Sequence, residues 1–244
     1  MTTETTDPSS EIISEQMVDR VLVITIDDGR ANALSFGLID ELGAALQRAA
    51  SNDAVGAVVL AGRPGRFSAG FDLSVIQSGD PTAVERLLAA GGQLVHDIYA
   101  SGLPVVAACT GHALAAGALL MLACDYRVGP DAAVKIGLNE TAIGLALPGW
   151  AVAIAQDRLS RRHLQHAVAL AHLGDGQGAV AMGYLDEVVE ADKVVETAIT
   201  HAIHFAALDT RSYAVTAKRL RTTTLQAMTA DLQSNPAARA GHTR

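Results

Sequence analysis

The sequence has few of the residues that build covalent cross-links or metal centres. Its 244 residues include two cysteines, Cys109 and Cys124, with no CxxC pair and no Cys/His set at the spacing of metal ligands. Both cysteines have apolar neighbours, which favours two buried, reduced thiols over a disulfide. We therefore expect neither a structural disulfide nor a metal site.

Positive charge is scarce as well. The 18 Lys and Arg residues are outnumbered by 26 Asp and Glu, the formal net charge is -8, and no long basic run offsets it. Nucleic acids bind proteins through clustered cations, so we expect no nucleic-acid partner. The N-terminal sequence MTTETTDPSSE lacks the basic region and apolar stretch of a secretory signal. The cytoplasm is therefore the expected compartment.

One long segment is apolar enough to mimic a membrane span. Residues 103–124 have the necessary length. They also contain Pro104, Thr110, Gly111 and His112, which are more typical of a turn than of a membrane helix. We predict a buried strand, a tight turn and a buried helix here, and no membrane contact.

The composition is half apolar and only 4% aromatic, which favours closely packed helices and buried strands. Apolar runs predict strands over residues 20–27, 55–61, 104–108 and 125–128, and helical periodicity covers 35–46, 81–100 and 116–123. The strands are continuously apolar, which is typical of a sheet covered by helices. We therefore predict an α/β protein with a disordered tail (residues 1–14), an α/β core (15–190) and a helical region (191–244).

Two segments rich in small residues follow neighbouring predicted strands. Residues 67–73 read FSAGFDL, and residues 111–118 read GHALAAGA. Small side chains let a ligand approach the backbone, whose N–H groups can stabilise a developing oxyanion. Either segment alone is explained at least as well by a tight turn or by close packing of a helix on the sheet. Their joint occurrence is the more informative observation.

Glu140 lies in a largely apolar neighbourhood, residues 135–144. A carboxylate there is either an exposed loop residue or a group whose pKa is raised by burial, which suits proton transfer near neutral pH. Composition alone favours the exposed loop residue.

Together these three segments resemble the crotonase superfamily, also called the enoyl-CoA hydratase/isomerase family, and the resemblance extends over residues 20–217. Residues 67–73 are similar to its F-[SC]-A-G-x-D-[LI] segment. Residues 111–117 are similar to its G-x-A-x-G-G-G segment, with Ala115 and Ala116 where glycine is commoner. The resemblance implies a crotonase fold, a spiral of ββα units with a C-terminal helical region for oligomerisation and for covering CoA. It also implies a homotrimer or a dimer of trimers.

The resemblance also implies roles for individual residues. By position, the Phe71 and Ala116 amides would form an oxyanion hole, and Glu140 would carry a proton. CoA would arrive as part of an acyl-CoA substrate, with no separate cofactor. The implied CoA contacts are Arg30, Asn32, Ala33 and Leu34 in a first loop, and Ala69, Gly70 and Leu73 beside Phe71.

One departure from the family pattern bears on the reaction. Family hydratases carry two glutamates that position a water; the first would fall at Leu119 and the second at Glu140. Loss of one acid weakens hydration, whereas moving a double bond needs a single base. The chain is thus expected to isomerise enoyl-CoA. The alternatives are an enoyl-CoA hydratase of fatty-acid β-oxidation, weak or with a substitute for the missing acid, and a non-catalytic acyl-CoA binder.

A few other residues have both ordinary and functional interpretations. We expect His112 to bond to the backbone and Asp72 to cap a helix. Trp150 either closes the acyl pocket or packs in the core. A basic cluster either meets CoA phosphates or forms a solvated helix face; its members are Lys218, Arg219 and Arg221.

Overall fold

Two sheets organise the fold in the computed structural model, which describes residues 12–234. The larger sheet has the strand order β1-β2-β3-β5-β7-β9 and the smaller one β4-β6-β8. The strands are β1 (Ile13–Val18), β2 (Val21–Ile26), β3 (Ala57–Gly62), β4 (Gly65–Ser68), β5 (Val105–Ala108), β6 (Gly111–Leu114), β7 (Tyr126–Pro130), β8 (Ile136–Gly137) and β9 (Glu187–Val189). The helices are α1 (Phe36–Ala50), α2 (Leu73–Ile76), α3 (Pro81–Tyr99), α4 (Ala116–Leu122), α5 (Gly149–Arg158), α6 (Leu164–Ala167), α7 (Gly176–Met182), α8 (Val194–Ala206) and α9 (Thr210–Ser234), with short 3-10 turns η1 (Thr141–Ile143) and η2 (Ala191–Lys193).

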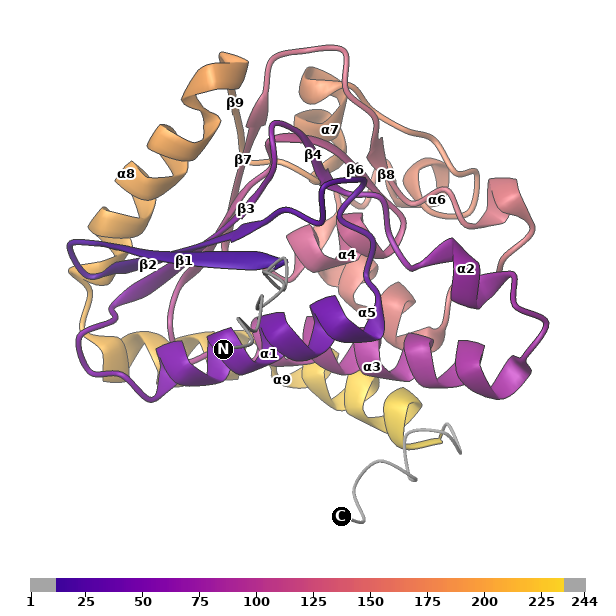
Figure 1. Cartoon of the computed structure of the whole chain (residues 1–244), viewed down its shortest axis with the longest axis horizontal. Helices are drawn as coiled ribbons and strands as arrows, with labels where there is room; N and C mark the ends of the chain where they lie inside the picture. Colours follow the sequence, from indigo (N-terminus) through magenta and orange to yellow (C-terminus); the bar gives the residue numbers. More distant parts are fainter. Residues whose placement is uncertain (1–11, 235–244) are drawn as a thin grey trace, which may run out of the picture.

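The larger sheet is covered on both faces. In β2, Val21 and Val23 pack with α8, while Leu22, Ile24 and Ile26 pack into the main core with α1 and α3. Figure 1 shows α8 on one side of this sheet and α1 and α3 on the other. Only β1 runs antiparallel to its neighbour, and the remaining pairs are parallel. The two-sided burial explains why the central strands have continuously apolar sequences.

The smaller sheet is built from short strands that each follow a strand of the larger one. β4 comes after β3, β6 after β5 and β8 after β7, and a helical segment follows each pair: α2 with α3, then α4, then η1. The described chain therefore repeats a ββα unit, which confirms the predicted spiral. Because β4, β6 and β8 pair in parallel, the segments that follow them emerge at one edge.

The strands predicted at residues 20–27, 55–61, 104–108 and 125–128 and the helices predicted at 35–46, 81–100 and 116–123 are confirmed. The segment 103–124 forms β5 and α4 as expected, but the expected tight turn between them contains a strand, β6. The tail predicted to reach residue 14 ends earlier, because Ile13 and Ser14 belong to β1; residues 1–11 of that tail lie outside the described residues. β1 escaped prediction because it is an edge strand with four exposed positions out of six. β4, β6 and β8 were not predicted as strands, because they span only two to four residues each.

One further expectation is met in the core. Cys109 and Cys124 are both free and buried, and burial raises the pKa of each thiol to about 12. No helix among residues 12–234 is long and apolar enough to cross a membrane.

Candidate active site

The smaller sheet brings the two glycine-containing segments together. β4 pairs with β6 so that Ser68 faces Ala113. A Cβ on Gly70, whose φ is 93°, would lie 3.3 Å from the Ala116 nitrogen, and one on Gly117 would lie 2.4 Å from the Ser68 carbonyl oxygen. Glycine at these two positions therefore allows the backbone after β4 to touch the start of α4.

The amides of Phe71 and Ala116 are available at this contact. Their neighbours are engaged: Asp72 N donates to Leu34 O at 3.2 Å, and Ala115 N donates to a carbonyl of β8 at 3.0 Å. Within residues 12–234, neither the Phe71 nor the Ala116 N–H donates to another protein group. Two free N–H donors on touching segments are the arrangement that an oxyanion requires.

The two alanines that replace glycine in the second segment differ in backbone conformation. Ala116, the first residue of α4, has a negative φ, so its methyl group is tolerated. Ala115 has φ 50° and ψ -126°, a region that side chains with a Cβ rarely adopt. The turn that presents the Ala116 amide is therefore strained at Ala115.

Glu140 is a half-buried residue with a buried carboxylate oxygen, and not an exposed loop residue. Its Oε2 is buried and has no hydrogen-bond partner among the described residues. Burial raises the pKa of Glu140 to about 7, although the backbone N–H groups of Glu140 and Asn139 lower it in part. The prediction that Glu140 is an exposed loop residue, which composition favoured, is thus wrong. The packing of distant segments around residue 140 decides its burial. A carboxyl with this pKa can both take up and release a proton near neutral pH.

The segment carrying Glu140 is joined to the turn before Ala116. β8 pairs with β6, and Gly137 O accepts from Ala115 N at 3.0 Å. One residue later, Leu138 N donates to the Tyr184 hydroxyl at 3.3 Å. The three segments singled out in the sequence therefore converge on one region.

Leu119 and Asn139 are two further residues that bear on the chemistry. Leu119 lies in α4, is only 1% exposed, and belongs to the main hydrophobic core. Asn139 Oδ1 is a second buried acceptor without a partner among the described residues. Sequence reasoning missed Asn139; the available signal was a polar residue directly before the acid in an apolar segment.

Comparison with known proteins identifies the family. The model of the enoyl-CoA hydratase/isomerase family matches residues 16–238. The chain belongs to this family.

Members with different names are similar to this chain. Human mitochondrial enoyl-CoA delta isomerase 1 is 30% identical over 206 residues, which cover 84% of this chain and 68% of that protein. A probable enoyl-CoA hydratase of Bacillus subtilis is 34% identical over 197 residues, which cover 76% of this chain and 72% of that protein. The apo structure of the Mtb enoyl-CoA isomerase superposes with a TM-score of 0.88 at 37% identity, covering 93% of this chain and 99% of that one. The crotonase fold is thereby confirmed, and the chain is an enzyme of the enoyl-CoA hydratase/isomerase family.

The two segments that resemble the family's CoA-binding loops form one hydrogen-bonded unit. Ala69 N donates to Ala31 O at 3.0 Å, and Leu34 N donates to Gly70 O at 2.8 Å. Of the expected contacts, Leu73 is 56% exposed and Arg30 is exposed, whereas Asn32 and Leu34 are fully buried. The side chains of Asn32 and Leu34 are therefore directed into the protein and away from any ligand on this surface.

The basic cluster on α9 divides into an internal and an external part. Arg221 is buried, forms an ion pair with Asp125, and donates to Tyr99 O at 2.8 Å. Arg221 is thus a structural residue, and neither a phosphate ligand nor part of a solvated helix face, which corrects both interpretations of the sequence at this position. Lys218 and Arg219 remain exposed.

The other single residues have mostly ordinary roles. His112 Nδ1 accepts from Lys135 N at 2.8 Å, as expected of a backbone-bonded histidine. Asp72 caps α2 by accepting from Ser74 N at 2.9 Å. Trp150 is buried in the main core, where it packs against Gly92 of α3, which favours the packing interpretation.

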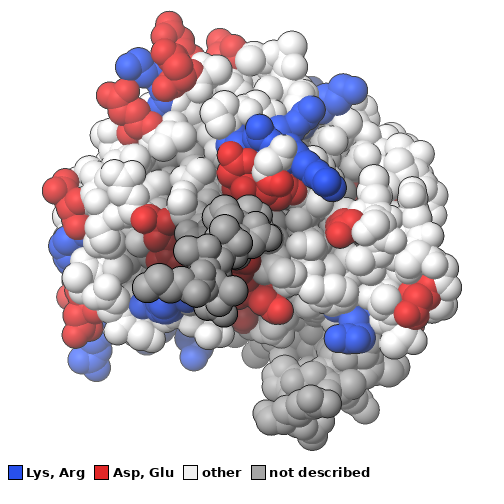
Figure 2. Space-filling view, viewed as in Figure 1, with Lys and Arg blue, Asp and Glu red and all other residues white. Residues whose placement is uncertain are grey.

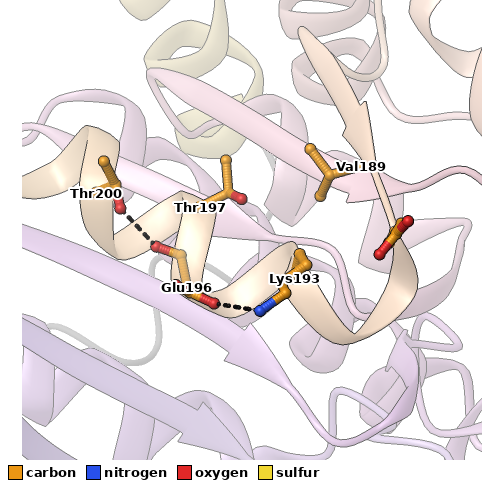
Figure 3. Close-up of a pocket in the computed structure, with 6 residues that line it drawn as sticks. Val189, Lys193, Glu196, Thr197 and Thr200 are labelled. Carbon is orange, nitrogen blue, oxygen red and sulfur yellow. Dashed lines mark hydrogen bonds and ion pairs between the residues drawn. The ribbon is translucent and has the colours of Figure 1, made fainter.

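A shallow groove of about 510 Å³ lies elsewhere, on α8 and β9 (Figure 3). Lys193 and Thr200 both turn toward Glu196 in it, with Lys193 Nζ 3.0 Å from the carboxylate. No residue of the candidate site lines it, and α8 covers the face of the sheet opposite α4. We therefore do not assign the groove to the substrate. Its lining residues are Val189, Glu190, Lys193, Glu196, Thr197 and Thr200.

Proposed function

We propose that this enzyme binds a 3-enoyl-CoA thioester and moves its double bond to the 2-position, with Glu140 as the single proton carrier. The observation that carries the proposal is the pairing of one buried acid, whose pKa is raised to about 7, with an aliphatic residue at position 119. A hydratase of this family would carry a second glutamate at position 119. Leu119 can neither ionise nor orient a water.

The proton and electron movements of the proposed isomerisation balance without a cofactor. The thioester oxygen accepts from the Phe71 and Ala116 amides, which increases the acidity of the C2 protons. Ionised Glu140 takes a proton from C2; the electrons of that C–H bond form a C1=C2 double bond, and the π pair of the thioester C=O moves onto the oxygen. When the oxygen pair returns to re-form C=O, the C1=C2 pair shifts to C2=C3, and the former C3=C4 pair takes the same proton back from Glu140 at C4. A carboxyl with a pKa near the working pH suits both transfers.

Cations beside the first loop expected to bind CoA, of which Arg63 is half-buried and paired with Asp27, support the CoA half of the proposal. Arg63 Nη1 donates to Arg30 O at 3.2 Å. Arg66 lies opposite His112 in the strand pair β4–β6, and His112 in turn accepts from Lys135 N. Figure 2 shows Lys and Arg side chains gathered near the end of the molecule where Figure 1 draws β4, β6 and β8, with acidic side chains beside them. In a chain of net charge -8, this local cluster suits the phosphates of CoA.

Apolar side chains near Glu140 support a homo-oligomer, as a trimer or a dimer of trimers. Ile143, Leu145 and Leu170 are 53%, 39% and 65% exposed. Thr141 Oγ1 donates to Ala169 O at 3.1 Å, so the segments that carry them are adjacent. Contiguous apolar surface of this kind is typical of subunit interfaces. Light scattering on the purified protein would overturn this part if it gave a monomer.

Hydration is the second candidate, and Asn139 is the observation that favours it. Its Oδ1 is buried, as is Oε2 of the following residue, Glu140, and offers a second acceptor that could hold a water in place of the missing glutamate. In that case Asn139→Ala would abolish hydration of 2-enoyl-CoA and leave isomerisation of 3-enoyl-CoA largely intact.

The deciding experiment compares 3-enoyl-CoA and 2-enoyl-CoA as substrates of the wild type and of Glu140→Gln. We expect the wild type to isomerise the 3-enoyl substrate much faster than it hydrates the 2-enoyl one, and Glu140→Gln to lose isomerisation. Glu196→Gln, in the remote groove, is the matched control and should keep full activity. Dominant hydration would overturn the isomerase, and CoA binding without turnover of either substrate would identify a non-catalytic binder.

A further inference from the structure

Asn32 has a buried position that a ligand contact does not explain. Its exposed fraction is zero, although it lies in the first loop expected to contact CoA. Its φ of 53° falls in the left-handed region, which asparagine adopts more readily than most residues. A buried polar residue in this conformation is retained where its hydrogen bonds hold a particular backbone shape.

The Asn32 carboxamide joins three parts of the chain. Nδ2 donates to Ile26 O at 2.8 Å, to Phe67 O at 3.2 Å and to Arg66 O at 3.3 Å. Oδ1 accepts from Asp28 N at 3.1 Å. A single side chain therefore fastens the loop after β2 both to the end of β2 and to β4.

The backbone of the same loop then fixes the segment that carries Phe71. Asn32 O accepts from Ser68 Oγ at 2.7 Å, and the same hydroxyl accepts from Gly70 N at 3.3 Å. Backbone hydrogen bonds also join residues 31–34 to residues 69–72 on both sides of the Phe71 amide. The direction of that N–H thus depends on the loop that Asn32 anchors.

We propose that Asn32 is a positioning residue that sets the Phe71 amide in the oxyanion hole without touching the substrate. The role rests on the proposed thioester binding, since it concerns how well the carbonyl is polarised. Loss of the carboxamide should then lower kcat, which depends on polarisation, more than it raises KM, which depends mainly on the CoA contacts.

Two variants and one control separate this role from general stability. Asn32→Gly keeps the left-handed backbone accessible and removes only the carboxamide. Ser68→Ala removes the hydroxyl that links Asn32 O to Gly70 N, and it decides the question if Asn32→Gly does not fold. Val59→Ala, in the cluster beneath α8 on the other face of the sheet, provides a destabilised protein with an untouched site.

The readout is carbonyl polarisation together with turnover. A conjugated 2,4-dienoyl-CoA absorbs at longer wavelength when its thioester oxygen accepts strong hydrogen bonds. We expect the wild type to produce this shift, and Asn32→Gly and Ser68→Ala to lose most of it with at least about a tenfold fall in kcat and a KM change within about threefold. Val59→Ala should keep the full shift.

Three results would overturn the role, and they can be told apart. If the wild type shifts the spectrum and the folded variants shift it equally, the Phe71 amide does not depend on Asn32. If the wild type itself gives neither shift nor turnover, the thioester site proposed above fails, and the positioning role fails with it. Equal losses in Val59→Ala would likewise assign the effect to stability alone.

Discussion

Gly91, in the middle of α3, lies directly against the aromatic ring of Phe71. A Cβ at position 91 would be 2.3 Å from Cε1 of that ring, so only a hydrogen fits. The next residue, Gly92, has the same relationship to Trp150, with a Cβ 2.7 Å from its Cε2. Each glycine costs a helix interior about 1 kcal/mol relative to alanine. Close approach of the two rings explains why α3 tolerates both.

Gly91→Ala is therefore expected to impair catalysis. The added methyl group must displace the Phe71 ring and, with it, the adjoining amide, and small displacements of a catalytic donor reduce rates by roughly tenfold or more. Gly92→Ala is the matched control, because it strains the same helix against Trp150 instead. Steady-state kinetics with denaturant unfolding should show reduced kcat in Gly91→Ala alone. Equal kcat values in the two variants would show that the position of the Phe71 ring does not affect the proposed oxyanion hole.

The activity should depend on the ionisation of Glu140. Because the base must be unprotonated and its pKa is about 7, kcat/KM for isomerisation should fall as the pH drops through that value. An ordinary glutamate, with a pKa of 4.5, would leave the rate constant across this range. The pH profile of the wild type with 3-enoyl-CoA is the measurement. A flat profile between about pH 6 and 8 would contradict the assignment of Glu140 as the base.

The same buried acid should make the protein less stable at higher pH. Its pKa is raised from 4.5 in the unfolded chain to about 7 in the fold, so between these values the native state keeps a proton that the unfolded state has lost. The free energy of unfolding therefore falls as pH rises through this window, by about 3 kcal/mol at most.

Glu140→Gln lacks this titration and provides the comparison. Urea unfolding should find the variant close to the wild type at about pH 5 and more stable than it at about pH 8. A variant that is less stable at the higher pH would mean that the carboxylate is well solvated or paired in the fold.

The sequence indicated which residues form the candidate site, but not how the rest of the fold surrounds them. α3 was readable because Asp80 caps it, Pro81 begins it, and apolar residues repeat along its length. Strands β4, β6 and β8 could not be predicted from the sequence, because strands this short are defined by pairing between segments far apart in the chain. The amides of Phe71 and Ala116 were proposed from the glycine-rich pattern, which is local. The partial burial of Glu140 was not predicted, because distant residues such as Tyr184, whose hydroxyl accepts from Leu138 N, hold the segment that carries it.

The burial of Arg221 likewise could not be predicted from the sequence, and it leads to a test of stability. Its partner Asp125 also accepts from Tyr213 Oη at 2.7 Å and from Val105 N at 2.8 Å, so the pair docks α9 onto β5. Removing one member of a buried pair leaves an uncompensated charge, so Arg221→Met should cost about 3–5 kcal/mol in urea unfolding. Arg219→Ala, on the exposed side of the same helix, should change stability by less than about 0.5 kcal/mol. Similar small effects in both would show that Arg221 is not part of the fold's support.

Ala115 and Ala116 offer a matched pair of substitutions with opposite expected signs. Ala115 has φ 50°, where a Cβ is strained, so Ala115→Gly should relieve that strain and stabilise the protein by about 1 kcal/mol. For a chain of this size, that corresponds to a rise in Tm of about 2–4 °C. Ala116 has ordinary helical geometry, so Ala116→Gly should instead destabilise the protein by up to about 1 kcal/mol. Calorimetry of both variants checks the signs together. If Ala115→Gly lowered Tm as Ala116→Gly does, the turn that presents the oxyanion amide would not be under strain, and its methyl group, which faces Gly70, would be the stabilising contact instead.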